Sequence, residues 1–228
     1  MIPLKDDNPT SSRPIVTYFL IGLCVVVFLI QLGSQSYKTG QLFYSYGLIP
    51  SVLMGKNQLP IDLYVLPAYL TIFSSMFMHG GFMHLIGNML YMWIFADNIE
   101  DNLGPKKFII FYLLSGIGAA MAQVFMDTNS QVPMVGASGA IGGVLGAYLI
   151  NHPHARVLVL IPFGFFSQFI KIRALYVLGF WFILQFISSG GGIAYAAHIG
   201  GFISGVILIL FFNKKTKKNE KIIKGPWG

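Results

Sequence analysis

The sequence has few charged residues. Only 10% of its 228 residues are Asp, Glu, Lys or Arg, whereas 55% are hydrophobic. An average soluble domain carries about 25% charged residues. A chain with so little charge cannot cover a water-facing surface, so the composition argues against an ordinary soluble domain and predicts residence in a lipid bilayer.

Acidic residues are especially scarce, with eight Asp and Glu against fifteen Lys and Arg, which gives a formal net charge of +7. The excess positive charge is concentrated, because six of the fifteen basic residues lie within 214–224. A basic segment directly after an apolar run is typical of the cytoplasmic flank of a membrane helix. A nucleic-acid-binding protein would need a basic folded surface instead, so we predict no nucleic-acid partner.

The sequence also lacks the residues of a disulfide or a zinc site. Its single cysteine, Cys24, cannot form an intrachain disulfide and lies in an apolar run, where it is interpreted as a small apolar residue. No His-Glu-x-x-His segment occurs, and His79 and His84 have no nearby carboxylate in the sequence. We therefore predict neither a metal nor another cofactor.

Six apolar stretches are candidates for membrane-spanning helices. A crossing helix needs about 20 mostly apolar residues, or fewer where it packs among other helices. The fourth stretch is short and rich in Gly and Ala, which favours the centre of a bundle. We predict an all-α polytopic membrane bundle, with a short cytoplasmic tail over 1–14, a transmembrane domain over 15–212 and a basic cytoplasmic tail over 213–228. The expected spans cover 15–32, 82–96, 108–126, 138–150, 175–188 and 194–212.

Lys and Arg are distributed unevenly between the two sides of this predicted bundle. The side that holds both termini receives thirteen of the fifteen, and the other side receives two. The positive-inside rule therefore predicts a multi-pass protein with both termini cytoplasmic, and we expect a bacterial plasma membrane. Residues 157–170 are apolar, but they are few and interrupted by Pro162 and Gly164. We interpret them as an interfacial segment on the cytoplasmic side.

Four of the polar side chains within the expected spans stand out: His84, Asn88, Ser138 and His198. Polar groups inside a membrane are costly, so each suggests a function. A single such group more often ties helices together or bonds to its own backbone. The predicted orientation, however, places all four at a similar depth in the outer half of the membrane. His84 and Asn88 are also four residues apart, on one helix face.

These groups can supply what acyl transfer requires. A serine hydroxyl becomes an effective nucleophile when a base takes its proton, and His198 can do this for Ser138. A tetrahedral oxyanion needs preorganised donors, which His84, Asn88 and the backbone N–H of Ser138 can provide. Among the acidic residues only Asp127 has a suitable depth. We interpret it as a loop residue, which leaves a Ser–His dyad without a third acidic member.

Small residues recur at intervals of four on the fourth and sixth expected spans. This spacing lets two helix backbones approach closely, which would bring Ser138 and His198 together. The small positions are Gly139, Gly142, Gly143, Gly146 and Ala147 on the fourth span, and Ala197, Gly201 and Gly205 on the sixth.

Four segments carry a resemblance to a known family: HGGFMHLIGN at 79–88, residues 100–104, GASGA at 136–140, and AHIGG at 197–201 followed by Gly205. In this order they resemble the rhomboid family of intramembrane serine proteases. The resemblance implies a Ser138–His198 dyad, oxyanion stabilisation by His84 and Asn88, and single-span membrane proteins as substrates, cut near the outer face of the bilayer. It also implies a structural turn at Glu100 and Gly104.

Two positions depart from the family's pattern. Many members carry a large aromatic residue four positions after the nucleophile, where this sequence has Gly142, so Phe202 or an aromatic residue of the fifth span would have to orient His198. Leu70 and Thr71 stand where many members carry Trp-Arg in the outer loop.

Two other functions stay open. A catalytically inactive relative could bind transmembrane clients without cutting them, although both dyad residues are present. A small transporter could use the same polar groups, although transporter sites lie near the membrane midplane.

Overall fold

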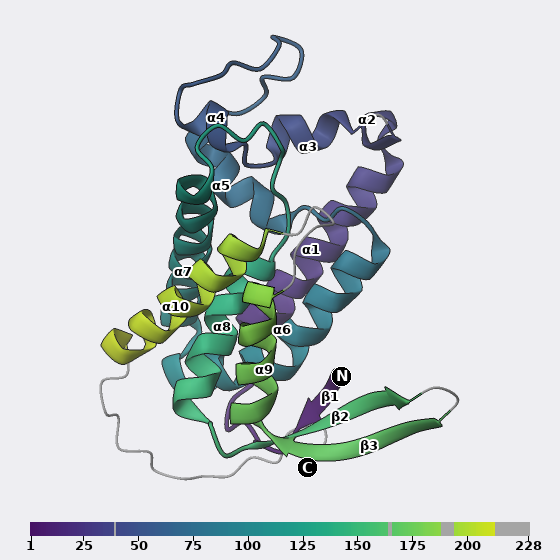
Figure 1. Cartoon of the computed structure of the whole chain (residues 1–228), viewed down its shortest axis with the longest axis vertical. Helices are drawn as coiled ribbons and strands as arrows, with labels where there is room; N and C mark the ends of the chain where they lie inside the picture. The colour runs from purple at the N-terminus through teal and green to yellow at the C-terminus, as the bar shows by residue number, and fades with distance from the viewer. Residues whose placement is uncertain (39, 164–165, 188–193, 213–228) are drawn as a thin grey trace.

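The computed structural model describes residues 1–38, 40–163, 166–187 and 194–212 (Figure 1). Each of the expected spans corresponds to a helix in these ranges, apart from residue 188 at the end of the fifth. The predicted basic tail over 213–228 lies outside the described residues. The helices of the bundle are α1 (Ile15–Gly33), α6 (Phe82–Leu103), α7 (Pro105–Met126), α8 (Ser138–Asn151), α9 (Ala174–Ile187) and α10 (Tyr195–Phe212).

Three of these helices, α1, α7 and α10, are long and apolar enough to cross a membrane by length and composition. Two more, α8 and α9, are apolar but have 14 residues each. The helix α6 has 22 residues and continues past the expected end at residue 96, through a polar final segment that holds Asp97, Glu100 and Asp101. The chain is therefore a mostly helical membrane protein.

The helix α8 lies at the centre of the bundle, as its small residues predict. Every residue over 139–148 is buried, and the helix packs against α6, α7, α9 and α10. Its contact with α10 is backbone against backbone. A Cβ atom added at Gly201 would collide with the carbonyl oxygen of Gly139, and one added at Gly205 would collide with that of Gly143. Glycine at these positions is what permits the close approach.

The segment between α1 and α6 forms short helices over the end of the bundle where α8 begins (Figure 1). The loop before α8 is fastened to this segment, because Leu48 and Met134 form an antiparallel bridge. The backbone N–H of Gly136 also donates to the carbonyl oxygen of Ser75 at 2.9 Å. The start of α8 is thus held in place by the segment above it. The short helices are α2 (Gln35–Lys38), α3 (Gln41–Tyr46), α4 (Pro50–Leu53) and α5 (Thr71–Ser74), with 3₁₀ turns η1 (Ala68–Leu70) and η2 (Ser75–Phe77).

At the opposite end of the bundle the prediction of an all-α fold is wrong. The strands β1 (Ile2–Asp6), β2 (Arg156–Phe163) and β3 (Phe166–Arg173) form an antiparallel sheet in the order β1-β2-β3. The apolar run after α8 alternates, with Val157 and Val159 fully buried and the residue between them only partly so. A period of two and β-branched side chains favour strands over a helix.

The turn implied at Glu100 and Gly104 has a structural role. The buried carboxylate of Glu100 accepts from the backbone N–H groups of Val16 at 2.9 Å and Thr17 at 2.8 Å, and from the Thr17 hydroxyl at 2.8 Å. The Glu100 carboxylate thus satisfies backbone N–H donors that have no partner within the first turn of α1. Gly104 joins α6 to α7 with a φ of +75°, a conformation that favours glycine.

Candidate active site

Ser138 is the first residue of α8 and is half-buried. The chain reaches it through Gly136, which has a φ of +131° that side-chain-bearing residues rarely adopt. Because the first backbone N–H groups of a helix have no partner within the helix, donors remain free around the Ser138 hydroxyl. The site therefore begins with a hydroxyl at a helix N-terminus.

His198 on α10 meets Ser138 directly. The Nε2 atom of His198 lies 2.8 Å from the Oγ atom of Ser138. The close α8–α10 contact predicted from the small residues explains this meeting, because glycine carbonyls rather than side chains separate the two helices. The structure thus brings together the two residues proposed from the sequence as nucleophile and base.

The other ring nitrogen of His198 has a partner that is not among the residues predicted from the sequence. The Nδ1 atom lies 2.7 Å from the Oε1 atom of Gln185 on α9. The Gln185 Nε2 group donates to the carbonyl oxygen of Trp181 at 2.7 Å, so the amide oxygen faces the imidazole. An amide oxygen only accepts, which assigns the Nδ1 proton to His198 and leaves Nε2 free to accept from the Ser138 hydroxyl. Gln185 was recognisable as an amide in an apolar span.

The aromatic contact to His198 also comes from α9. The Trp181 ring centroid lies 5.7 Å from that of His198, with 34° between the planes. Of the two alternatives expected, the aromatic residue of the fifth span is therefore the one that packs on the imidazole, while Phe202 stacks on Phe182 at 4.4 Å. Gly142 has no room for a side chain, because a Cβ atom there would lie 2.9 Å from the His198 carbonyl oxygen.

His84 lies on the other side of the Ser138 loop. A Cβ atom added at Gly136 would lie 2.7 Å from the Cε1 and Nε2 atoms of His84 and 3.6 Å from the Ser138 Oγ atom. The backbone N–H of Gly80 donates to His84 Nδ1 at 3.4 Å. In the neutral imidazole this leaves Nε2 as the N–H donor, on the side that faces the Ser138 loop.

Asn88 lies one turn further along α6 and is buried, with 8% of its surface exposed. Within the described part of the chain, its Nδ2 group has no hydrogen-bond partner. A buried donor without a partner is costly unless a ligand or water uses it. His84 and Asn88 thus come from one face of α6, which packs against α8.

Asp127 stays outside this arrangement, as the interpretation of a loop residue predicts. It follows the last residue of α7, and its Oδ1 atom accepts from the backbone N–H of Asn129 at 2.9 Å. Among the described residues, no group of three or more His, Cys, Asp and Glu side chains could hold a metal ion.

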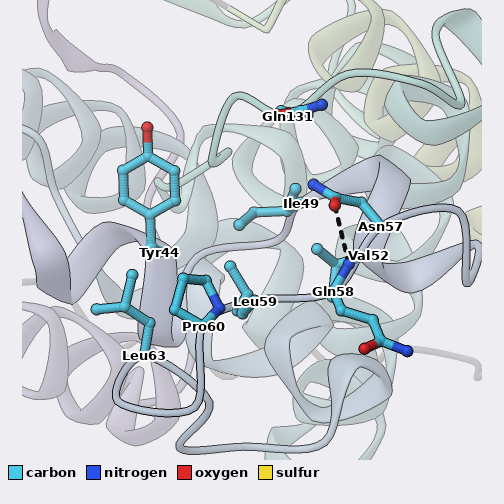
Figure 2. Close-up of a pocket in the computed structure, with 9 residues that line it drawn as sticks. All are labelled: Tyr44, Ile49, Val52, Asn57, Gln58, Leu59, Pro60, Leu63 and Gln131. Carbon is cyan, nitrogen blue, oxygen red and sulfur yellow. Dashed lines mark hydrogen bonds between the residues drawn. The ribbon is translucent and has the colours of Figure 1, made fainter.

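A separate pocket lies in the segment between α1 and α6 (Figure 2). Its walls include Tyr44 of α3, Val52 of α4 and the loop from Asn57 to Leu63. None of the four side chains proposed from the sequence lines it. The pocket is therefore distinct from the site around Ser138.

Comparison with known proteins gives matches over most of the chain. A family model described as the Rhomboid domain matches residues 66–215. Rhomboid protein 1, mitochondrial, of Saccharomyces cerevisiae is 30% identical over 159 residues, which cover 67% of this chain and 44% of that protein. Rhomboid protease GluP of Bacillus subtilis is 29% identical over 196 residues, which cover 86% of this chain and 34% of that protein.

A third relative is Presenilin-associated rhomboid-like protein A, mitochondrial, of Danio rerio. It is 32% identical over 154 residues, which cover 66% of this chain and 39% of that protein. The matched region is thus less than half of each of these three relatives.

Proposed function

This chain belongs to the rhomboid family, and from that premise we propose that it is an intramembrane serine endopeptidase with Ser138 as nucleophile and His198 as general base. The observation that carries the proposal is the continuous chain of hydrogen bonds from Gln185 through His198 to Ser138. It holds the imidazole in the tautomer that can accept the serine proton.

In the first step the Ser138 Oγ atom attacks the carbonyl carbon of the scissile peptide bond while its proton passes to His198 Nε2. The protonated imidazole then donates this proton to the leaving amine, and the C–N bond breaks. A water molecule, deprotonated in turn by His198, hydrolyses the acyl-enzyme and regenerates the Ser138 hydroxyl. Gln185 bonds to the imidazole and to the Trp181 carbonyl oxygen and to none of the reacting atoms, so it acts as a positioning residue.

The negative charge on the tetrahedral oxygen needs donors that are already in place. We assign this role to the Nε2–H group of His84, the Nδ2 group of Asn88 and the backbone N–H of Ser138. The position of the His84 ring beside Gly136 supports the first assignment. The unpartnered, buried amide of Asn88 supports the second.

We further propose that six helices cross the membrane within a domain over 15–212, flanked by cytoplasmic tails over 1–14 and 213–228. The substrates are then membrane proteins with a single span, which reach Ser138 through the bilayer. The uneven distribution of Lys and Arg supports the orientation. A bacterial plasma membrane remains a proposal from the sequence, and the mitochondrial names of two of the relatives do not support it.

The test is cleavage of a single-span model substrate by the purified protein in lipid vesicles, followed by mass spectrometry of the products. We expect the Ser138→Ala variant to lose at least about 10⁴-fold in turnover. The Ser167→Ala variant, which changes an exposed serine outside the site, should keep the wild-type rate. Turnover retained by Ser138→Ala would contradict the mechanism. Binding of substrate by the wild-type protein without any cleavage would favour the inactive relative.

A further inference from the structure

The hairpin formed by β2 and β3 extends sideways past the helices, at the end of the bundle that carries β1 (Figure 1). The half of the hairpin nearest the bundle is packed, with Val157 and Val159 fully buried. The half nearest the tip is not. Phe166 is 79% exposed and Phe169 is 65% exposed.

The two phenylalanines lie on opposite faces of the hairpin, because side chains alternate along a strand. Phe169 pairs with Leu160 on one face, and Ile161 lies on the other face with Phe166. Each face of the tip therefore presents one exposed phenylalanine, beside the exposed polar residue Gln168 or Ser167. Exposed aromatic side chains on both faces of a hairpin mark contact with a membrane or another protein.

The base of the hairpin carries positive charge on one face. Arg156 and Arg173 lie directly opposite each other in the register, and Lys171 lies two residues from Arg173 on the same face, opposite Leu158. All three are exposed. Like charges directly opposite each other destabilise a strand pair, and an anion beside them relieves that repulsion. Two carboxylates lie near this base: Asp6 pairs with Val157, and the Oδ1 atom of Asp7 accepts from the Arg156 backbone N–H at 2.6 Å.

The unpaired edge of the hairpin limits how deep it can lie in a membrane. The strand β3 is at the edge of the sheet, and no described strand pairs with its outer side. Unpaired backbone groups are not tolerated in the hydrocarbon core, so the hairpin cannot cross it. The boundary between acyl chains and headgroups satisfies both requirements, because apolar side chains enter the acyl region while backbone groups and basic residues stay among headgroups.

We propose that the β2–β3 hairpin is an interfacial membrane anchor. Its tip, with Phe166 and Phe169, enters the acyl chains of the leaflet at this end of the bundle, and its basic base, with Arg156, Lys171 and Arg173, binds the phosphate groups of anionic lipids. The strand β3 ends at Arg173 and α9 begins at Ala174. The anchor thus fixes the depth at which α9 enters the bundle.

The test measures which solvent surrounds the tip, and it does not depend on protease activity. Single cysteines replace Phe166 or Phe169 in a Cys24→Ala background and carry an environment-sensitive fluorophore. The labelled proteins are placed in nanodiscs of phosphatidylcholine and phosphatidylglycerol, which expose both faces of the bilayer. Quenching by brominated acyl chains reports lipid contact, and quenching by iodide reports water. Ile110→Cys on the exposed side of α7 is the lipid control, and Asp62→Cys in an exposed loop is the water control.

We expect both tip labels to be quenched by brominated chains to within about twofold of the Ile110 label, as burial at the acyl boundary requires. Iodide should quench the Asp62 label most. Tip labels that behave like the Asp62 label would overturn the anchor. Tip labels shielded from both quenchers would overturn it as well, because they would indicate contact with a second copy or another protein.

The charge requirement has its own test in the same nanodiscs. The double variant Lys171→Gln, Arg173→Gln should weaken insertion of the tip by about fivefold per charge removed when phosphatidylglycerol is present. It should have no effect in pure phosphatidylcholine. An equal effect in both lipids would contradict binding of anionic headgroups.

Discussion

The helix α10 meets its neighbours α8 and α9 in two different ways. Toward α8 it presents glycines, and the two backbones approach so closely that a Cβ atom at Gly201 or Gly205 would collide with α8 carbonyls. Toward α9 the contact is made by side chains, with Gln185 and Trp181 reaching His198. The first contact fixes where the nucleophile and the base lie. The second fixes how the base is oriented. Stability and catalysis should therefore respond differently to changes on the two sides.

The largest effect is expected at the glycine contact. Gly201→Val places a branched side chain against the carbonyl of Gly139, which costs about 3 kcal/mol of stability because two backbones must separate. Thermal unfolding in detergent measures the loss. Gly179→Val is the matched control on α9, where an added Cβ atom has nothing within 4 Å, and it should change stability by less than about 1 kcal/mol. Equal losses in both variants would contradict the backbone contact.

Asn88→Ala should act on catalysis while leaving the fold intact. Removing one oxyanion donor lowers kcat by about 10²-fold or more, because the stabilisation is lost only in the transition state. Substrate cleavage measured over a range of concentrations separates kcat from KM, and the fall should be in kcat. Met83→Ala, which truncates an exposed side chain on the same helix, is the control. A variant with wild-type kcat would remove Asn88 from the site.

Gln185→Leu should produce a smaller fall in kcat, of about 10-fold to 10²-fold, because the imidazole loses the acceptor that orients it. Gln185→Glu restores an acceptor at the same length and should recover part of the rate. Ile183→Ala, an exposed position on the same helix, should leave the rate unchanged. If Gln185→Leu and Gln185→Glu have equal rates, the hydrogen bond to Nδ1 does not position His198.

The smallest effect on catalysis is expected at the far end of α8, where the hydroxyl of Tyr148 donates to the Asp6 carboxylate of β1. Burial raises the pKa of Asp6 from 3.8 to about 7. Because the folded state then binds this proton more tightly than the unfolded state, the free energy of unfolding falls as the pH rises from about 4 toward 7, and it levels above that. Thermal unfolding at several pH values measures this slope.

Asp6→Asn should remove the contribution of Asp6 to this pH dependence of the free energy of unfolding, while it keeps an acceptor for the Tyr148 hydroxyl. Asp62→Asn, an exposed carboxylate in a loop, should retain the wild-type slope. A slope that is unchanged in the Asp6 variant would mean that another group causes it.

The two contacts also differ in how far the sequence predicts them. The meeting of Ser138 and His198 depends on helices that touch through glycine, and glycines at intervals of four are visible in the sequence. The positions of Gln185 and Trp181 depend on how α9 is placed, and long side chains at a helix surface have no such local pattern. A polar Gln185 in an apolar helix was nevertheless a signal for a buried partner.

The sheet was missed for a different reason. The length and composition of residues 157–170 correctly argue against a crossing helix, but they do not distinguish a strand from another interfacial segment. The alternation of Val157 and Val159 with less buried neighbours was a strand signal in the same segment. Its pairing with β1, more than 150 residues earlier in the chain, is a long-range contact that a local pattern does not specify.

The most direct measurement is covalent labelling of the purified protein with a fluorophosphonate, which reacts with a serine hydroxyl only when a base activates it. We expect labelling of the wild-type protein at Ser138, and loss of labelling in both the Ser138→Ala and the His198→Ala variants while each remains folded in detergent. Labelling of the His198→Ala variant at the wild-type rate would contradict the central claim that this imidazole activates this hydroxyl.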